Sequence, residues 1–323
     1  MKEKMKAIIY TKFGPPDVLH LAEVEKPTPT DNQVLIRIFA TTVAKEDPDM
    51  RAAPGINGLV KPKNPILGMY LAGEIEQVGG KVQRFKIGDL VYGSAGVKGG
   101  TNAEYICLSE DAALVKKPEN LSFQQAAAVP NGAITTVPFL VHLAQIKAGH
   151  TMLITGASGT VGTSALQLGK YYGAEITGVC STKKIDLIQS LGADKVIDYT
   201  QEDFTQNGET YDIIFDTVGS SSFSRCKSSL NPRGLYLTTV PTLEMIPHML
   251  NPFSSSGRSI KFAATALRST TKQLVDLAII NQIIEEGRYL PVIDKVYPLE
   301  EIVQAHKYVK AGHKTGDVVI TIV

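Results

Sequence analysis

The first 121 residues carry short apolar runs that are separated by glycine and proline. Pairs such as residues 14–15 and 79–80 have the composition of turns. The runs with strand composition are 34–38, 73–78 and 103–108. Short strands at this spacing predict a compact, barrel-like β domain over residues 1–121.

After residue 121 the pattern changes to alternating strand-like and helix-like segments. Ser122 and Gln125 have the spacing of a capping box at a helix start, and a second helical stretch covers about 133–147. Strand-like runs then follow at 152–155, 175–180, 195–199, 211–217, 235–240 and 261–266. Helical patterns lie between most of these runs, which predicts an α/β fold with a doubly wound parallel sheet covered on both faces.

The C-terminal segment is expected to return to the first domain. The pattern predicts a helix from about 270 to 286, another from Glu300 to about 310, and a last strand over 318–321. We assign residues 292–323 to the β-rich domain together with 1–121, which leaves the nucleotide-type domain inserted at 122–291. A cleft between the two domains is where we expect a substrate to bind.

Composition excludes several classes of protein. The 323 residues contain 33 Lys and Arg and 32 Asp and Glu, so nothing favours nucleic acid or a membrane surface as a partner. The charged N-terminus is unlike a signal peptide, and no run of about 18 apolar residues predicts a membrane span. Cys107, Cys180 and Cys226 lie far apart, which argues against a disulfide framework. We therefore expect a cytoplasmic protein.

The segment from Leu153 to Gly162 is the strongest candidate for a binding site. It starts as an apolar strand, turns on small residues and continues into a helix, as a nucleotide-binding βα turn does. Gly159 allows the backbone to approach a pyrophosphate, and Gly162 allows the helix to pack close to the strand. The predicted cofactor contacts in this turn are Ala157, Ser158, Gly159, Thr160 and Val161.

The end of the next strand predicts which nucleotide binds. An NAD site carries Asp or Glu there to hold the ribose hydroxyls, whereas this chain has Ser181, Thr182, Lys183 and Lys184. A 2′-phosphate would gain charge-assisted contacts from Lys183 or Lys184 and a hydrogen bond from Ser181. The residues therefore favour NADP(H) over NAD(H). The alternative is a solvated helix start with two surface lysines.

Two later strands end in further candidate contacts. Asp216 and Thr217 close the fourth strand of the series, on the side where open α/β sheets bind their ligands. Val218 and Gly219 follow them and are predicted near the nicotinamide ribose, and Val240 at the end of the fifth strand is also a candidate. An ordinary strand-to-helix turn is the alternative interpretation.

These segments resemble the zinc-free quinone oxidoreductase branch of the medium-chain dehydrogenase/reductase superfamily. The resemblance covers nearly the whole chain and rests on residues 129–133, 157–162, 191–194, 196–199 and 312–316. It implies a GroES-like catalytic domain with an inserted Rossmann domain, NADPH as cofactor, a small-molecule substrate and a homodimer. By spacing, Lys184 and Tyr199 match the lysine and tyrosine that contact the adenosine 2′-phosphate in quinone oxidoreductases.

The positions that bind zinc in related dehydrogenases carry other residues here. Residues 41–47 contain no cysteine, and Met69 stands at the histidine position. The lobe with four cysteines is also missing, because residues 93–96 pass almost directly to 99–101. We expect no metal. Hydride transfer to a quinone or an α,β-unsaturated carbonyl is then favoured, because the conjugated substrate itself stabilises the developing charge.

Family positions make Val43, Asp47 and Tyr70 the candidate substrate contacts. Ala44 replaces the asparagine that the branch often carries, so that polar anchor is absent. Tyr70 either donates a hydrogen bond to an enolate oxygen or is a packing residue. Asp47 either orients a neighbouring residue or begins a turn at residues 47–48, and the turn is favoured. Thr135 either positions the nicotinamide carboxamide or lies in the core. No catalytic acid is assigned.

The residues also bear on three other classes of protein. A short-chain dehydrogenase is excluded, because the glycines at 156, 159 and 162 lack its spacing and no tyrosine has a lysine four residues later. A zinc-type alcohol dehydrogenase is disfavoured, whereas a non-catalytic NADPH-binding protein of the same fold stays open. In a homodimer, the strand at 261–266 would lie at the sheet edge and pair with its twin.

Overall fold

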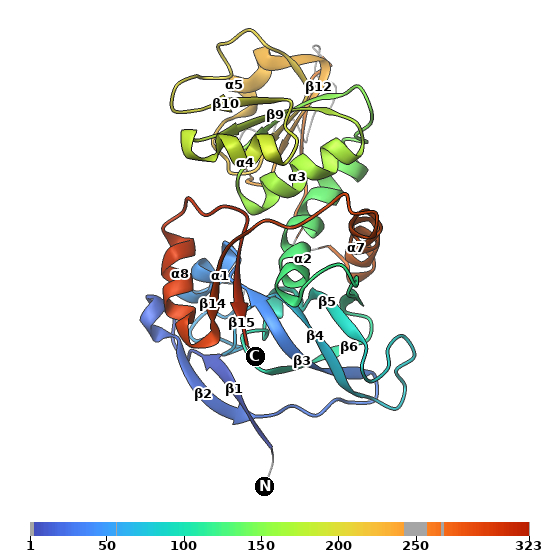
Figure 1. Cartoon of the computed structure of the whole chain (residues 1–323). Coiled ribbons are helices and arrows are strands. Elements are labelled where there is room, and N and C mark those ends of the chain that lie inside the picture. Colours follow the sequence, from blue (N-terminus) through green and yellow to red (C-terminus); the bar gives the residue numbers. More distant parts are fainter. Residues whose placement is uncertain (1–2, 56, 242–256, 266–267, 323) are drawn as a thin grey trace. The chain divides into compact units, whose positions relative to one another are not determined.

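The computed structural model describes residues 3–55, 57–241, 257–265 and 268–322 (Figure 1). Its internal contacts divide the chain into two compact units. The first unit holds Met1–Asn131, Arg268–Glu285 and Leu290–Val323, and the second holds Gly132–Leu267 and Glu286–Tyr289. The predicted domain bounds place residues 122–131, 268–285 and 290–291 differently, and they stay a prediction.

A seven-stranded sheet is the framework of the first unit. Its strand order is β14-β15-β3-β4-β5-β7, and β6 pairs with β3. The strands are β3 Gln33–Thr42, β4 Tyr70–Val78, β5 Leu90–Ser94, β6 Tyr105–Ser109, β7 Ala113–Lys116, β14 Ile293–Pro298 and β15 Asp317–Thr321. A separate antiparallel pair is formed by β1 Lys4–Ile9 and β2 His20–Glu25. Each strand predicted in this region overlaps β3, β4 or β6, which confirms the β-rich first domain.

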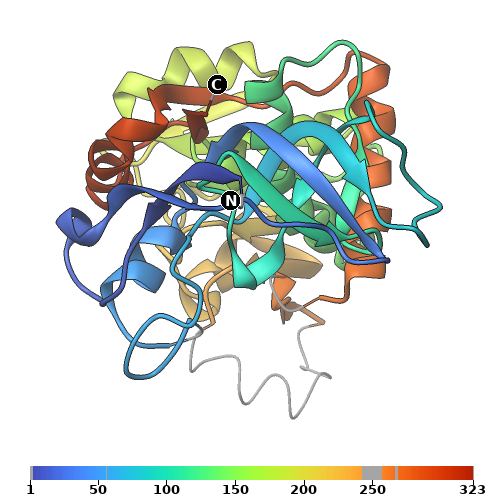
Figure 2. The ribbon, with the colours of Figure 1, turned by 90° about the horizontal axis from the view of Figure 1, so that it is seen from below.

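Among the described residues, three α-helices lie wholly in the first unit: α1 Glu46–Ala52, α7 Thr270–Glu285 and α8 Ile302–Lys310. Helix α7 contacts β7, and α8 contacts α1 and the 3-10 turn Pro16–Val18. Figure 2 shows red α8 beside the blue N-terminal segment, where Lys307 Nζ lies 3.0 Å from Asp17 Oδ1. Because β15 pairs antiparallel with β3, the C-terminal residues complete the sheet of this unit.

Helix α2, Phe123–Val137, begins at the predicted capping box. Ser122 N–H donates to Gln125 Oε1 over 2.9 Å, and Gln125 N–H donates to Ser122 Oγ over 3.1 Å. The helix runs through Pro130 and continues as a π-helical turn, Pro138–Leu143, so the predicted separation into two helices is wrong. Pro130 and Gly132 would each be expected to interrupt a helix. Close tertiary packing overrides this preference, because a Cβ on Gly132 would lie only 2.8 Å from Ser164 Cβ.

The run Phe123–Leu143 is long and apolar enough for a membrane span by length and composition alone, with a mean hydropathy of 1.3. Within its most apolar stretch, 78% of the residues are buried. This burial is typical of a core helix in a globular protein.

The second unit is built on a six-stranded parallel sheet of order β10-β9-β8-β11-β12-β13. The strands are β8 Thr151–Thr155, β9 Glu175–Cys180, β10 Lys195–Asp198, β11 Tyr211–Asp216, β12 Leu230–Thr238 and β13 Ser259–Phe262. The order reverses between β8 and β11, as in a Rossmann fold, so the predicted fold class is confirmed. The last strand begins at Ser259 and ends at Phe262, and Ala266 of the predicted strand lies outside the described residues.

Helices connect the strands of this sheet. Helix α3, Thr160–Tyr171, contacts β8 and β9, and α4, Ile185–Ser190, contacts β9 and β10. The short α5, Phe223–Cys226, contacts β12. In such a sheet, ligands bind at the carboxyl ends of the strands, where the order reverses.

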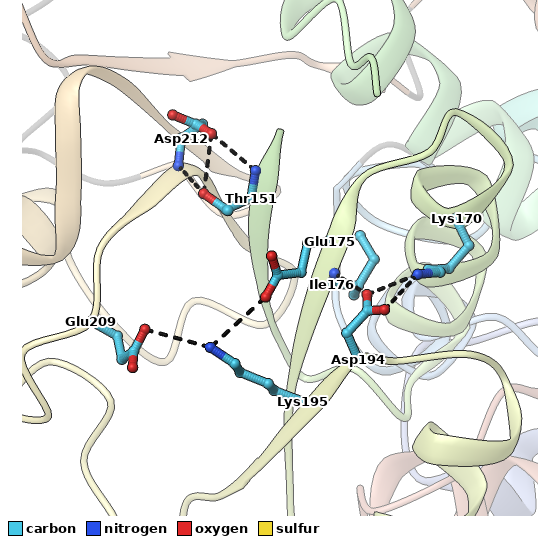
Figure 3. Close-up of polar contacts among 8 residues, drawn as sticks. All are labelled: Thr151, Lys170, Glu175, Ile176, Asp194, Lys195, Glu209 and Asp212. Atoms are coloured by element: carbon cyan, nitrogen blue, oxygen red, sulfur yellow. Dashed lines mark hydrogen bonds and ion pairs between the residues drawn. The ribbon is translucent and has the colours of Figure 1, made fainter. Parts of the chain in front are cut away.

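Polar contacts hold the amino ends of the same strands (Figure 3). Asp212 Oδ2 accepts hydrogen bonds from Thr151 N–H over 2.9 Å and from Thr151 Oγ1 over 3.1 Å. Lys195 Nζ lies 3.8 Å from Glu175 Oε1 and 3.7 Å from Glu209 Oε2, and these exposed pairs add little stability. The contacts at the amino ends thus connect neighbouring strands. The candidate site lies at the opposite, carboxyl ends of the strands.

Candidate active site

The turn between β8 and α3 is built on three closely spaced glycines. Gly156 has a φ of 66°, and a Cβ there would lie 2.6 Å from Val218 Cγ1. A Cβ on Gly162 would lie 2.2 Å from Gly156 O, so the helix packs as close to the strand as the sequence predicts. At Gly159, only Gly156 O lies within 4 Å of such a Cβ among the described residues, at 3.5 Å. The backbone at Gly159 is therefore accessible to a ligand.

Helix α3 begins directly after this turn. Its first hydrogen bond runs from Thr163 N–H to Gly159 O over 2.9 Å, and Thr163 Oγ1 donates to the same oxygen over 3.0 Å. A helix start presents first-turn amides and the positive end of the helix dipole, and both favour an anion. The turn is tied to β9, because Ala157 N–H donates to Val179 O over 3.1 Å. Such a turn suits a pyrophosphate.

The side chains of the turn differ in accessibility. Ala157 and Thr160 are buried, whereas Ser158 and Val161 are partly exposed. Burial leaves Ala157 with a backbone role only, and the predicted contacts of these residues with a cofactor stay predictions.

Ser181, Lys184 and Tyr199 meet at the carboxyl ends of β9 and β10. Tyr199 N–H donates to Cys180 O over 3.1 Å, and Lys184 N–H donates to Ser181 O over 2.9 Å. Tyr199 is 58% exposed, and Ser181 and Lys184 are partly exposed. The three residues predicted to surround a 2′-phosphate therefore lie at one corner of the sheet.

Asp198 is a carboxylate at this corner that sequence reasoning did not use. Its strand register places it opposite Cys180, at the end of β10. Asp198 Oδ2 accepts from Thr182 Oγ1 over 2.5 Å, and Oδ1 accepts from Thr200 N–H and Oγ1 over 2.9 and 2.8 Å. The hydrogen bond from Thr182, with those from Thr200, lowers the pKa of this carboxyl. Both oxygens are thus engaged by protein donors.

Val218, Gly219 and Val240 lie together at the ends of β11 and β12. Gly219 has a φ of 70°, and a Cβ there would lie 3.0 Å from Val240 Cβ. Thr217 Oγ1 donates to Thr155 O over 2.8 Å, which holds this group beside the turn after β8. The structure thus brings together three predicted cofactor contacts, of which Val218 and Gly219 are the two predicted near the nicotinamide ribose.

Thr135 lies in the part of α2 that belongs to the second unit. It is partly exposed, whereas residues 131–134 and 136–140 are buried. Thr136 belongs to the core, because its Oγ1 donates to Gly132 O over 2.9 Å and lies 2.9 Å from Ser164 Oγ. Thr135 is therefore the accessible threonine of the pair, and its contact with nicotinamide stays a prediction.

Tyr70 opens β4 in the first unit. Its side chain is partly buried, and its hydroxyl forms no hydrogen bond with another described residue. Burial, with the carboxylates of Glu46, Asp47 and Asp317 nearby, raises the pKa of the Tyr70 phenol far above its usual range. The phenol is protonated at neutral pH, as an ordinary tyrosine is, and it can donate a hydrogen bond.

Asp47 and Val43 are the other predicted substrate contacts, and both are buried. Asp47 lies in the first turn of α1, where Oδ2 accepts from Ala44 N–H over 2.8 Å. The chain continues there as a helix rather than as the separate turn expected at residues 47–48. Burial raises the pKa of Asp47 to about 7. Val43 packs in the apolar core with Leu299 and Val318, and both substrate contacts stay predictions.

No group of three or more His, Cys, Asp or Glu side chains within the described ranges is arranged to hold a metal ion. Met69, at the position where related dehydrogenases carry a histidine ligand, is buried, with only 7% of its surface exposed. The donor set that zinc requires is therefore not assembled in this part of the chain.

Known proteins resemble the chain over nearly its whole length. Residues 30–119 match the family "Alcohol dehydrogenase GroES-like domain", and residues 191–320 match the family "Zinc-binding dehydrogenase". Human quinone oxidoreductase is 31% identical over 331 residues, which cover 98% of each chain. The chloroplastic NADPH-dependent alkenal/one oxidoreductase of Arabidopsis thaliana is 30% identical, with 98% of this chain and 80% of the relative covered.

A solved structure shows the same likeness. The quinone oxidoreductase from Coxiella burnetii superposes with a TM-score of 0.86 at 28% sequence identity. The match covers 99% of this chain and 100% of that structure.

Proposed function

Because the chain belongs to the quinone oxidoreductase-like branch of the medium-chain dehydrogenase/reductase superfamily, we propose that it transfers hydride from NADPH to quinones or α,β-unsaturated carbonyls without a metal ion. As a member of this branch, the protein is an NAD(P)-dependent oxidoreductase that acts on small molecules. The choice of NADPH, the acceptor class and the independence from metal are the proposed parts.

The observation that carries the choice of NADPH is the corner formed by Ser181, Lys184 and Tyr199. Lys183 adds a second positive charge there, and the nearby Asp198 carboxylate already accepts hydrogen bonds from Thr182 and Thr200. An unphosphorylated ribose would need a free carboxylate at this place, whereas a 2′-phosphate needs cationic and hydroxyl donors. The donors present suit the phosphate.

The residues of the chain bind and orient the reactants. The turn at Gly159 and the start of α3 would hold the pyrophosphate, and the group around Val218 would hold the nicotinamide half. When bound, NADPH supplies the hydride. Tyr70, whose phenol is neutral, would donate a hydrogen bond to the substrate oxygen on which negative charge develops.

Two features support a conjugated acceptor and a metal-free reaction. The zinc ligand positions carry other residues, so a simple carbonyl would lack its Lewis acid. A quinone or an enone instead spreads the incoming charge over its own conjugated system. The names of the relatives, quinone oxidoreductase and alkenal/one oxidoreductase, are in line with these two acceptor classes.

The test is a steady-state assay of the purified protein with NADPH and a panel of quinones and enones, before and after dialysis against a metal chelator. We expect turnover with at least one acceptor class and no loss after chelation. Tight NADPH binding without turnover of any member would contradict the proposal and favour a non-catalytic NADPH-binding protein. Loss of turnover on chelation would contradict the metal-free reaction.

We also propose that the protein works in the cytoplasm as a homodimer, with small molecules rather than nucleic acid or a membrane as partners. The balanced charge of the chain supports the choice of partners. The position of β13 at an edge of the six-stranded sheet supports pairing with a second copy.

A further inference from the structure

The loop Val218–Ser221 follows β11 at the place where the strand order of the sheet reverses. Its backbone is held by one side chain, Asp216, which is fully buried. Asp216 Oδ1 accepts from the amides of Val218, Gly219 and Ser220 over 3.2, 2.8 and 3.3 Å. Oδ2 accepts from Ser221 N–H over 3.0 Å. Four consecutive amides thus converge on one carboxylate.

The same carboxylate joins the neighbouring strands. Thr155 Oγ1, at the end of β8, donates to Asp216 Oδ1 over 2.7 Å. Tyr236 OH, on β12, donates to Oδ2 over 2.9 Å. A buried carboxylate that accepts from amides and hydroxyls, without a cation among these partners, is satisfied only while the loop keeps this path.

The path of the loop sets where its residues lie relative to the turn after β8. Val218 Cγ1 would lie 2.6 Å from a Cβ on Gly156, so the loop packs directly against the glycine turn. Gly219 has a φ of 70°, a conformation that other residues adopt rarely and that the Asp216 hydrogen bond stabilises. Movement of the loop would therefore change the space beside the turn.

We propose that Asp216 is a positioning residue for the cofactor: it fixes residues 218–221 so that they hold the nicotinamide half of NADPH. The inference rests on the proposed function, because it requires NADPH at the carboxyl ends of β8 and β11. It adds a role for a buried residue that touches the cofactor only through the loop.

The test uses two probes on the full-length protein: NADPH, and adenosine 2′,5′-bisphosphate, which contains only the adenosine half. In Asp216→Asn, the amide nitrogen cannot accept a hydrogen bond, so at least one loop amide loses its partner. We expect the dissociation constant for NADPH to rise about tenfold, while that for the bisphosphate changes by less than about twofold.

The matched control is Asp212→Asn at the amino end of the same strand. Asp212 also accepts from a backbone amide and a hydroxyl, those of Thr151, and from Asn231 Nδ2 over 2.9 Å. It lies at the amino end of β11 (Figure 3), whereas the loop follows the carboxyl end of that strand. We expect it to lower the melting temperature and to leave both dissociation constants within about twofold of the wild-type values, since its hydrogen bonds are structural only.

If the role of Asp216 were purely structural, Asp216→Asn would weaken the binding of both probes equally or of neither. Either result would overturn the proposal. If Asp216→Asn does not fold, Tyr236→Phe and Thr155→Val each remove one hydroxyl donor and keep the carboxylate. Each variant should raise the dissociation constant for NADPH about two- to fivefold and leave that for the bisphosphate unchanged. Unchanged NADPH binding in both variants would also overturn the proposal. These are binding readouts, so an enzyme that lacks acceptor turnover would contradict the proposed function alone.

Discussion

Lys184 is the residue whose charge should separate NADPH from NADH. Replacing it by alanine removes a charge-assisted contact with the 2′-phosphate, which NADH lacks. We expect Lys184→Ala to raise the dissociation constant for NADPH about 10- to 100-fold and that for NADH less than about twofold. Fluorescence titration of the two nucleotides measures both.

Lys195→Ala is the matched control for this titration. Lys195 is an exposed lysine that lies at the amino end of β10, between Glu175 and Glu209 (Figure 3). It should leave both dissociation constants unchanged. Equal losses for NADPH and NADH in Lys184→Ala would show that the lysine does not contact a phosphate.

His306 is a fully buried side chain with a consequence for stability. Neither ring nitrogen has a hydrogen-bond partner among the described residues. Burial, together with the positive charge of Arg51, lowers the pKa of His306 from 6.5 to about 3. The unfolded chain therefore binds a proton more readily between these values, so this residue makes stability fall as the pH falls through that window.

Asp47, on the neighbouring helix α1, acts in the opposite direction. Its pKa is raised from 3.8 to about 7, so the folded protein binds a proton more readily than the unfolded chain between these values. That difference makes stability fall as the pH rises through the same range. The two effects oppose each other over most of the window.

Removing His306 should expose the effect of Asp47. When the pH is lowered from about 7 to about 5, His306 should cost the wild type about 2 kcal/mol of unfolding free energy. His306→Leu should lack this loss, so its unfolding free energy should fall less over the same range, or rise. Urea unfolding at the two pH values measures the difference. The same pH dependence in variant and wild type would show that His306 titrates normally in the folded protein.

At the scale of elements, two glycines of the turn between β8 and α3 should affect different properties: Gly162 the stability of the protein and Gly159 the binding of NADPH. A Cβ on Gly162 would meet Gly156 O and the Ala157 backbone at 2.2 and 2.7 Å, and backbone cannot move aside cheaply. Gly162→Ala should therefore cost about 1 to 3 kcal/mol of unfolding free energy. Gly159 has a φ of −77° and open space around it, so Gly159→Ala should fold normally but bind NADPH less tightly.

Thermal melts and NADPH titrations of both variants check this pair. If Gly159→Ala bound NADPH like the wild type, a pyrophosphate would not approach the backbone there. If Gly162→Ala were as stable as the wild type, the close contact of helix and strand would not be required.

The periodic elements were predictable from the sequence because local patterns determine them. Each predicted strand of the parallel sheet overlaps an observed strand, and the capping box at Ser122 is present in the structure, since period, composition and cap spacing are local features. The two-helix prediction around Pro130 was wrong, because close packing around Gly132 overrides the local signals. The sixth strand begins two residues earlier than predicted and ends at Phe262, because its pairing with β12, a tertiary contact, sets its ends.

The candidate site was predictable only where its residues follow one another in the chain. The glycine turn and the residues after β9 were identified as neighbours of a cofactor from their order alone. The contacts of Asp198 and Asp216 were not, because they depend on which strand lies beside which and in what register. The parallel register that places Asp198 opposite Cys180 has no signature in a single sequence.

At the scale of the whole molecule, β13 at the sheet edge predicts the oligomeric state. This strand pairs with β12 on one side, and its other edge can extend the sheet with a second copy. Light scattering after size exclusion should give twice the 34.8 kDa mass of the chain. A mass equal to one chain at all concentrations would remove the homodimer.

The ratio of kcat/KM for NADPH to that for NADH, measured with one enone on chelator-treated protein, tests the central proposal most directly. We predict that NADPH is preferred at least about tenfold and that added zinc changes neither value. Equal or greater efficiency with NADH, or turnover that returns only when zinc is added, would contradict it.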